Sequence, residues 1–85
     1  MRVFITGASS GLGAALARHY AAQGATLGLL GRNMGRLTAL ADTLNQPHAL
    51  YQADVADAAA VQQAAHDFMQ RFGVPDIVIA NAGIS

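Results

Sequence analysis

Short apolar runs alternate along the chain with segments whose apolar residues recur every three or four positions. The runs predict four strands, and the segments between them predict three helices. A chain that alternates strands and helices in this way folds into a parallel sheet with right-handed crossover connections. The strands are expected at residues 3–5, 26–30, 49–53 and 77–80.

Residues with known preferences for helix ends stand where the three helices should begin and end. Gly24 is expected just beyond the first helix, in the left-handed conformation that is usual there. Asn33 and Asp57 are expected to cap the second and third helices. Apolar spacing extends the second helix to Leu44, before the sequence Asn45-Gln46-Pro47 ends it. The apolar face of the first helix is predicted to consist of Leu12, Ala15, Leu16 and Tyr20.

The strands predict a Rossmann-type, doubly wound parallel sheet of class α/β. Its first strand lies centrally, with the next two strands on one side and the fourth on the other. Residues 49–53 are less apolar than the other runs and are expected near an edge. Residues 77–80 are apolar throughout, as in strands covered on both faces, and edge strands are rarely so apolar. We therefore expect an incomplete sheet, whose neighbouring strand comes from a longer chain or from a partner.

Composition excludes several classes of protein. The chain has 85 residues, 53% hydrophobic and 12% charged, with zero formal net charge and no cysteine. This length suits one domain or part of one, and the balanced charge argues against a nucleic-acid partner. The absence of cysteine excludes a disulfide framework, a thiolate metal site and a cysteine nucleophile. It is typical of the reducing cytoplasm.

Neither a membrane segment nor a metal site is expected. The uncharged run 3–17 is shorter than the ~18–20 apolar residues of a membrane span, and glycine and serine interrupt it. His19, His48 and His66 have no metal-ligand spacing, and the five aspartates are dispersed. All five basic residues are arginine, so these residues alone cannot complete a mechanism that needs lysine.

A glycine-rich segment with the pattern G-x-x-x-G-x-G lies between the first strand and the first helix. Gly7 is predicted to supply a sharp turn, Gly11 a close approach to a pyrophosphate, and Gly13 tight packing of helix on strand. The helix N-terminus then points its free N–H groups at the anion. The spacing differs from the G-x-G-x-x-G fingerprint, and the absence of lysine excludes a P-loop.

Two serines in the same segment, Ser9 and Ser10, are predicted to add hydroxyl hydrogen bonds to the phosphates. The alternative is a glycine-rich turn that binds no ligand, which the position between strand and helix disfavours. The predicted binding residues of this segment are Gly7, Ser9, Ser10, Gly11, Leu12 and Gly13.

The end of the second strand predicts which dinucleotide is bound. Dinucleotide-binding folds contact the adenosine ribose at this position. An acidic residue there binds the ribose hydroxyls of NAD, whereas an arginine accommodates the 2′-phosphate of NADP. This chain has Arg32 and Asn33 and no acid, which favours NADP(H) over NAD(H). The alternative for Arg32 is a solvated arginine at a strand end. Arg36, one turn further, is interpreted first as a surface residue and second as a phosphate partner.

The third and fourth strands are followed by two further candidates. Asp54 and Val55 are expected to face the adenine, with the carboxylate accepting from the exocyclic amine; the alternative is a strand end or helix cap. Asn81, Ala82 and Gly83 follow the fourth strand. Small residues there leave room for a cofactor, and the Asn81 amide can bridge backbone groups of the loop.

Together these motifs resemble the short-chain dehydrogenase/reductase family, in its standard-length branch. The segment Thr6–Gly13 is similar to its cofactor loop, Asp54-Val55 to its adenine contact, and Asn81-Ala82-Gly83 to its N-A-G motif. The order and spacing agree over essentially the whole chain. The resemblance implies that residues 1–85 are the N-terminal part of a single NAD(P)-binding Rossmann domain.

The chain also departs from the family pattern. Members that prefer NADP often carry a basic residue just before the middle glycine, where this chain has Ser10. The family often has two asparagines before the Ala-Gly pair, and Ala80 occupies the first place. The catalytic Ser and Tyr-x-x-x-Lys of the family lie beyond its N-A-G motif. Neither Tyr20 nor Tyr51 is followed four residues later by lysine.

The resemblance implies an oxidoreductase that transfers a hydride between NADP(H) and a small-molecule carbonyl or alcohol. Such an enzyme is expected to be cytoplasmic and a homodimer or homotetramer. These residues are expected to bind the adenosine and pyrophosphate without turning over substrate, because the general acid/base is absent. The alternative is a truncated or stand-alone dinucleotide-binding module without catalysis.

Overall fold

The computed structural model of the chain describes residues 1–81. Strands and helices alternate along these residues, as the sequence predicts. In chain order they are β1 (Arg2–Thr6), α1 (Gly11–Ala22), β2 (Thr26–Gly31), α2 (Met34–Ala41), β3 (His48–Gln52), α3 (Ala58–Phe72) and β4 (Ile77–Ala80).

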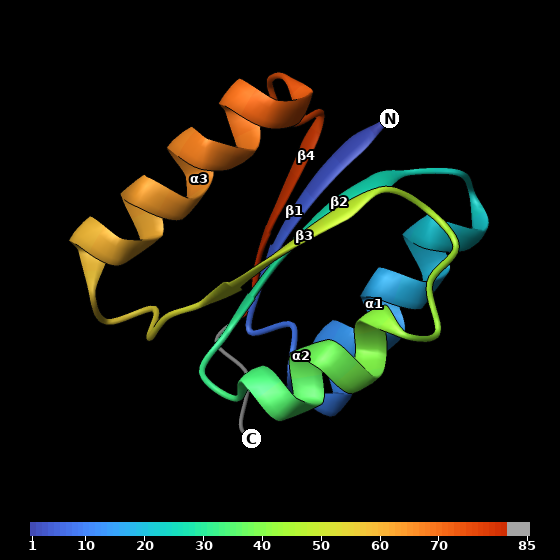
Figure 1. Cartoon of the computed structure of the whole chain (residues 1–85), viewed down its shortest axis with the longest axis horizontal. Coiled ribbons are helices and arrows are strands. Elements are labelled where there is room, and N and C mark those ends of the chain that lie inside the picture. Colours follow the sequence, from blue (N-terminus) through green and yellow to red (C-terminus); the bar gives the residue numbers. More distant parts are fainter. Residues whose placement is uncertain (82–85) are drawn as a thin grey trace.

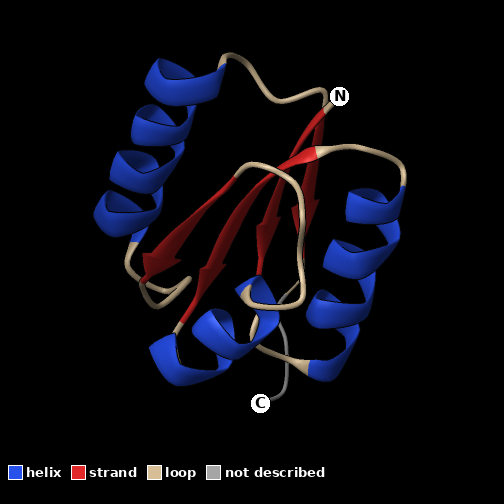
Figure 2. Ribbon diagram, turned by 45° about the vertical axis from the view of Figure 1, so that its right-hand side comes forward, coloured by secondary structure: helices blue, strands red, loops and turns tan. Residues whose placement is uncertain are grey.

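The strands form one parallel sheet in the order β3-β2-β1-β4. This confirms the predicted order, with the first strand inside the sheet and the less apolar third strand at an edge. Helices α1 and α2 cover one face and α3 covers the other (Figure 1). Because all four strands run in one direction (Figure 2), their carboxyl ends meet at a single edge of the sheet.

Each face of the sheet has its own apolar core. Val3, Ile5 and Leu29 are fully buried in the core beneath α1 and α2. On the other face, Phe4 meets Phe68 of α3 edge to face, with ring centroids 5.5 Å apart. Alternate residues of β1 therefore serve opposite cores, which is why the strand is apolar at successive positions.

The structure confirms half of the predicted apolar face of α1 and corrects the other half. Leu16 and Tyr20 are partly buried against the core, as predicted. Leu12 is 64% exposed, and Ala15 is also exposed, whereas Gly13 and Ala17 are buried. Small residues let this helix lie close to the strands, so the bulkier Leu12 projects outward. Apolar spacing alone ranks residues by hydrophobicity and therefore missed a contact face built from glycine and alanine.

The structure also differs from the prediction in the end of α2, the bounds of β3 and the burial of β4. Helix α2 ends at Ala41 rather than Leu44, because the N–H groups of Thr43 and Leu44 bond three residues back, to the carbonyls of Leu40 and Ala41. Strand β3 is displaced by one residue, His48–Gln52. Strand β4 is not covered on both faces by the described residues, since Val78 is 63% exposed.

A hydrogen bond joins the edge strand β3 to α3. The Tyr51 hydroxyl donates to Asp67 Oδ2 at 2.6 Å. Burial, and then this bond to a carboxylate, raise the pKa of Tyr51 from 10.0 to about 12. The folded state thus favours the neutral phenol, so this contribution to stability is complete below pH 10 and is lost as the pH rises through 12.

We expect Tyr51→Phe to remove this dependence on pH. The unfolding free energy of the wild-type protein should fall relative to that of Tyr51→Phe between pH 10 and pH 12. Urea denaturation of both proteins at pH 8, 10 and 11.5 measures the difference. An unchanged difference across this range contradicts the assignment.

Candidate functional site

The connection between β1 and α1 is a tight turn at the carboxyl edge of the sheet. Gly7 has φ +66°, a left-handed conformation that side chains rarely adopt. A Cβ atom there would also overlap the Asn81 carbonyl oxygen. The Ala8 N–H donates to the Leu30 carbonyl at 2.9 Å and so fastens the loop to β2. The turn predicted for Gly7 is therefore present, and the space beside it requires glycine as well.

The other two glycines of the loop have contrasting surroundings. A Cβ atom at Gly13 would overlap the Gly7 carbonyl oxygen and lie 2.8 Å from the Ala8 Cα. Gly13 therefore packs against the loop itself. At Gly11, which begins α1, an added Cβ atom meets nothing within 4 Å. The backbone at Gly11 is thus open to a ligand at the helix N-terminus.

Ser10 and Asn81 hold this loop closed. Ser10 is 4% exposed, and its hydroxyl donates to the Gly7 carbonyl at 2.8 Å. The same oxygen accepts from the Gly13 N–H at 3.1 Å and from Asn81 Nδ2 at 3.0 Å. Asn81 Nδ2 also donates to the Gly7 carbonyl at 3.2 Å. The hydroxyl of Ser10 is therefore committed to the protein as the cap of α1.

Ser9 lies differently from its neighbour. It is half-buried and packs on the end of β2, where a Cβ atom at Gly31 would lie 2.7 Å from Ser9 Oγ. Gly31 thus makes room for the loop, a role that the sequence analysis missed. Its signal is a glycine as the last residue of a strand beside the glycine-rich turn.

Arg32 and Asn33 follow β2 at the same edge of the sheet. The Asn33 side chain accepts a hydrogen bond from the Arg36 N–H at 3.0 Å, which confirms its predicted capping of α2. The Arg32 carbonyl accepts from Gln52 Nε2 at 3.3 Å, which links it to the end of β3. Both Arg32 and Asn33 are exposed.

Asp54 and Val55 lie in the turn between β3 and α3. Asp54 Oδ1 accepts from the Ala56 N–H at 2.9 Å, and Val55 is 45% exposed. The cap of α3 is Asp57, whose side chain accepts from the Ala60 N–H at 3.1 Å, as predicted. The predicted candidates Ala82 and Gly83 lie outside the described residues.

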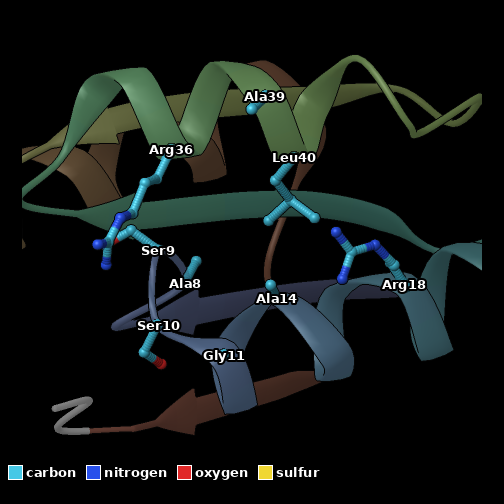
Figure 3. Close-up of a pocket in the computed structure, with 9 residues that line it drawn as sticks. All are labelled: Ala8, Ser9, Ser10, Gly11, Ala14, Arg18, Arg36, Ala39 and Leu40. Carbon is cyan, nitrogen blue, oxygen red and sulfur yellow. The ribbon is translucent and has the colours of Figure 1, made fainter. Parts of the chain in front are cut away.

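A cavity of about 390 Å³ opens between the loop, α1 and α2. Figure 3 shows Arg36 reaching from α2 toward Ser9, while Arg18 lies at the opposite end, on α1. Among residues 1–81 no carboxylate lines this cavity, so the charged side chains that these residues place there are both arginines. Its lining is Ala8, Ser9, Ser10, Gly11, Ala14, Arg18, Arg36, Ala39 and Leu40.

Two further searches of residues 1–81 gave negative results. None of the helices there has both the length and the apolar character to cross a membrane. Nor do three or more histidine, cysteine or acidic side chains in that range gather as metal ligands would.

The four parallel strands and three helices, with the glycine-rich loop at the carboxyl edge of the sheet, form a partial Rossmann-like fold. The family model of short chain dehydrogenases matches residues 1–85, and the chain belongs to this family. An NADPH-dependent pterin aldehyde reductase of Arabidopsis thaliana is 43% identical over 83 residues, 95% of this chain and 34% of that protein. A D-threitol dehydrogenase of Mycolicibacterium smegmatis is 42% identical over 84 residues, 95% of this chain and 32% of that protein.

Solved structures agree with this family and fold. A 3-ketoacyl-ACP reductase from Sinorhizobium meliloti superposes with a TM-score of 0.91 at 40% identity, covering 99% of this chain and 34% of that one. L-Sorbose reductase from Gluconobacter frateurii, complexed with NADPH and L-sorbose, superposes with a TM-score of 0.86 at 32% identity. This match covers 98% of this chain and 33% of the reductase. The chain thus spans about a third of the length of these relatives.

Proposed function

We propose that this chain supplies the adenosine- and pyrophosphate-binding half of an oxidoreductase that uses NADP(H). The observation that carries the proposal is the loop at the start of α1. Ser10 and Asn81 hold it closed from inside, while the backbone at Gly11 faces open space. A helix N-terminus exposed in this way is suited to an anion such as a pyrophosphate.

Each candidate residue then has a defined role. The first N–H groups of α1 have no acceptor within the helix and hold the pyrophosphate, beginning at Gly11. Arg32 binds the 2′-phosphate with Asn33 beside it, and Asp54 with Val55 contacts the adenine. The remaining proposed contacts are Gly7, Ser9, Ser10, Leu12, Gly13, Asn81, Ala82 and Gly83.

The cofactor, when bound, would exchange a hydride with a small-molecule substrate: NADPH would donate it to a carbonyl carbon, or NADP⁺ would accept it from an alcohol carbon. Support for NADP(H) comes from Arg32 in place of an acid, from a relative named as NADPH-dependent, and from a solved reductase complexed with NADPH. Tyr20 and Tyr51 lack a lysine four residues later, so we propose that other residues of the whole enzyme transfer the proton. We further propose a cytoplasmic homodimer or homotetramer.

The absence of lysine favours a second candidate, a dinucleotide-binding module without catalysis. The intact mass of the protein purified from its source separates the two. A mass near 8.7 kDa, with NADPH binding and no reductase activity, supports the module. A mass about three times larger, as in the relatives, with NADPH-dependent carbonyl reduction supports the oxidoreductase.

We expect Arg32→Ala to weaken NADPH binding and to leave NADH binding nearly unchanged. A charge-assisted hydrogen bond is worth about 1.5–3 kcal/mol, which corresponds to roughly 10- to 150-fold in Kd. Fluorescence titration of both cofactors against both proteins measures the effect. An equal loss for NADPH and NADH contradicts the role of Arg32 in binding the 2′-phosphate.

A further inference from the structure

The turn that carries Asp54 is anchored at its two ends to different elements. The Ala53 N–H donates to the Gly31 carbonyl at 2.9 Å, which ties the start of the turn to β2. At the other end, the Asp57 N–H donates to the Asp54 carbonyl at 2.9 Å, and Asp57 caps α3. The position of the Asp54 carboxylate therefore depends on how α3 stands relative to the sheet.

A cavity of about 400 Å³ opens between α3 and the edge strand β3, close to this turn. On the side of α3, small side chains such as Ala60 and Ala64 line it and leave the space unfilled. Apolar contacts are also non-directional, so packing alone defines the spacing of α3 and β3 only loosely. The full lining is Leu50, Tyr51, Gln52, Ala53, Ala60, Gln63, Ala64 and Asp67.

Two residues of this lining bond to each other and so join β3 to α3. The Tyr51 hydroxyl donates to Asp67 Oδ2 at 2.6 Å. Within residues 1–81 the other side-chain hydrogen bond between α3 and the sheet lies at the amino edge, where Arg2 Nε donates to the Phe72 carbonyl. Hydrogen bonds are directional, so the bond of Tyr51 is the contact nearest the turn that can fix the spacing of α3 and β3.

We propose that Tyr51 and Asp67 are positioning residues for the adenine contact, because their hydrogen bond sets where α3 stands and thereby where Asp54 meets the adenine amine. This inference rests on the proposed function. Asp54 Oδ1 accepts from the Ala56 N–H at 2.9 Å, and within residues 1–81 Oδ2 has no donor. Oδ2 is therefore the oxygen left for the amine, and its position follows that of α3.

The exocyclic amine of adenine gives a specific measurement. Deamino-NADPH contains hypoxanthine, so a carbonyl replaces the amine that Asp54 binds. Calorimetric titration of the full chain with NADPH and with deamino-NADPH measures the preference for the amine. We expect the wild type to prefer NADPH about tenfold or more. Tyr51→Phe and Asp67→Ala should each reduce this preference about threefold or more. Asp67→Asn should keep most of it, because an amide oxygen still accepts from the Tyr51 hydroxyl.

Two arginine variants serve as controls. Arg2→Met removes the other bond between α3 and the sheet, at the edge opposite the turn. Arg71→Met removes the ion pair that Arg71 forms with Asp67 at 3.6 Å, and leaves the bond of Tyr51 in place. Both arginines are exposed. Each variant should therefore keep the preference for NADPH within about twofold of the wild type.

The outcomes separate this inference from the function on which it rests. If the wild type binds neither dinucleotide, the proposed function and the positioning role are both overturned. Equal binding of the two dinucleotides by the wild type overturns the adenine contact of Asp54, and the positioning role with it. If Asp54→Ala removes the preference while Tyr51→Phe keeps it in full, only the positioning role fails. Equal losses in Arg2→Met and Tyr51→Phe also overturn this role, because they indicate a general loosening of α3.

Discussion

Gly13→Val is expected to destabilise the protein by about 3 kcal/mol and to abolish NADPH binding. A Cβ atom at Gly13 overlaps the Gly7 carbonyl oxygen and approaches the Ala8 Cα at 2.8 Å. Both are backbone atoms, which cannot rotate away, so the cost falls at or above the upper end of the ~1–3 kcal/mol usual for overpacking. For a domain of this size, such a loss lowers Tm by about 12–24 °C.

Gly11→Ala is the matched control for Gly13→Val. An added Cβ atom meets nothing within 4 Å at Gly11, and alanine favours the helix that begins there. Thermal stability should therefore be kept, while a methyl group on the ligand side weakens NADPH binding. Thermal unfolding with NADPH titration distinguishes the two variants. A Gly13→Val protein that unfolds and binds like the wild type contradicts the packing of this loop.

The strand order was predictable because parallel strands need long crossovers and an apolar sequence. The helix caps at Asn33 and Asp57 were predictable for a local reason, since each side chain bonds an N–H three residues away. The face of α1 was only partly predictable from hydrophobicity, which identified Leu16 and Tyr20. Gly13 and Ala17 are buried because they are small, and this depends on how closely the helix approaches the sheet.

In the candidate site, too, local features were predictable from the sequence and features that depend on packing were not. Glycine spacing predicted the turn at Gly7, because its left-handed conformation is a property of one residue. It could not separate Ser9 from Ser10, which are adjacent and chemically identical. Ser10 differs because it caps α1, where its oxygen accepts from the Gly13 N–H, and because Asn81, which lies more than seventy residues later, donates to the same oxygen. Long-range contacts of this kind are fixed by the sheet and leave no local pattern in the sequence.

Ser10→Ala is expected to destabilise the protein by about 2–4 kcal/mol and to weaken NADPH binding. Loss of the helix cap costs about 1 kcal/mol. One Asn81 amide hydrogen also loses its acceptor, and an unsatisfied buried donor costs about 1–3 kcal/mol. Urea denaturation with NADPH titration measures both effects, and Ser9→Ala is the control. Ser9 has no hydrogen bond from its hydroxyl within residues 1–81, so its loss should cost under about 0.5 kcal/mol.

A double-mutant cycle tests whether Ser10 and Asn81 act as a unit. Asn81→Ala removes the donors to Ser10 Oγ and to the Gly7 carbonyl, so each single variant breaks the bond between the two side chains. The double variant should then lose less stability than the sum of the single losses, by about 0.5–3 kcal/mol. Additive losses, or equal effects of Ser9→Ala and Ser10→Ala, contradict this role. A confirmed coupling means that Ser10 and Asn81 jointly hold the loop against the residue that follows β4.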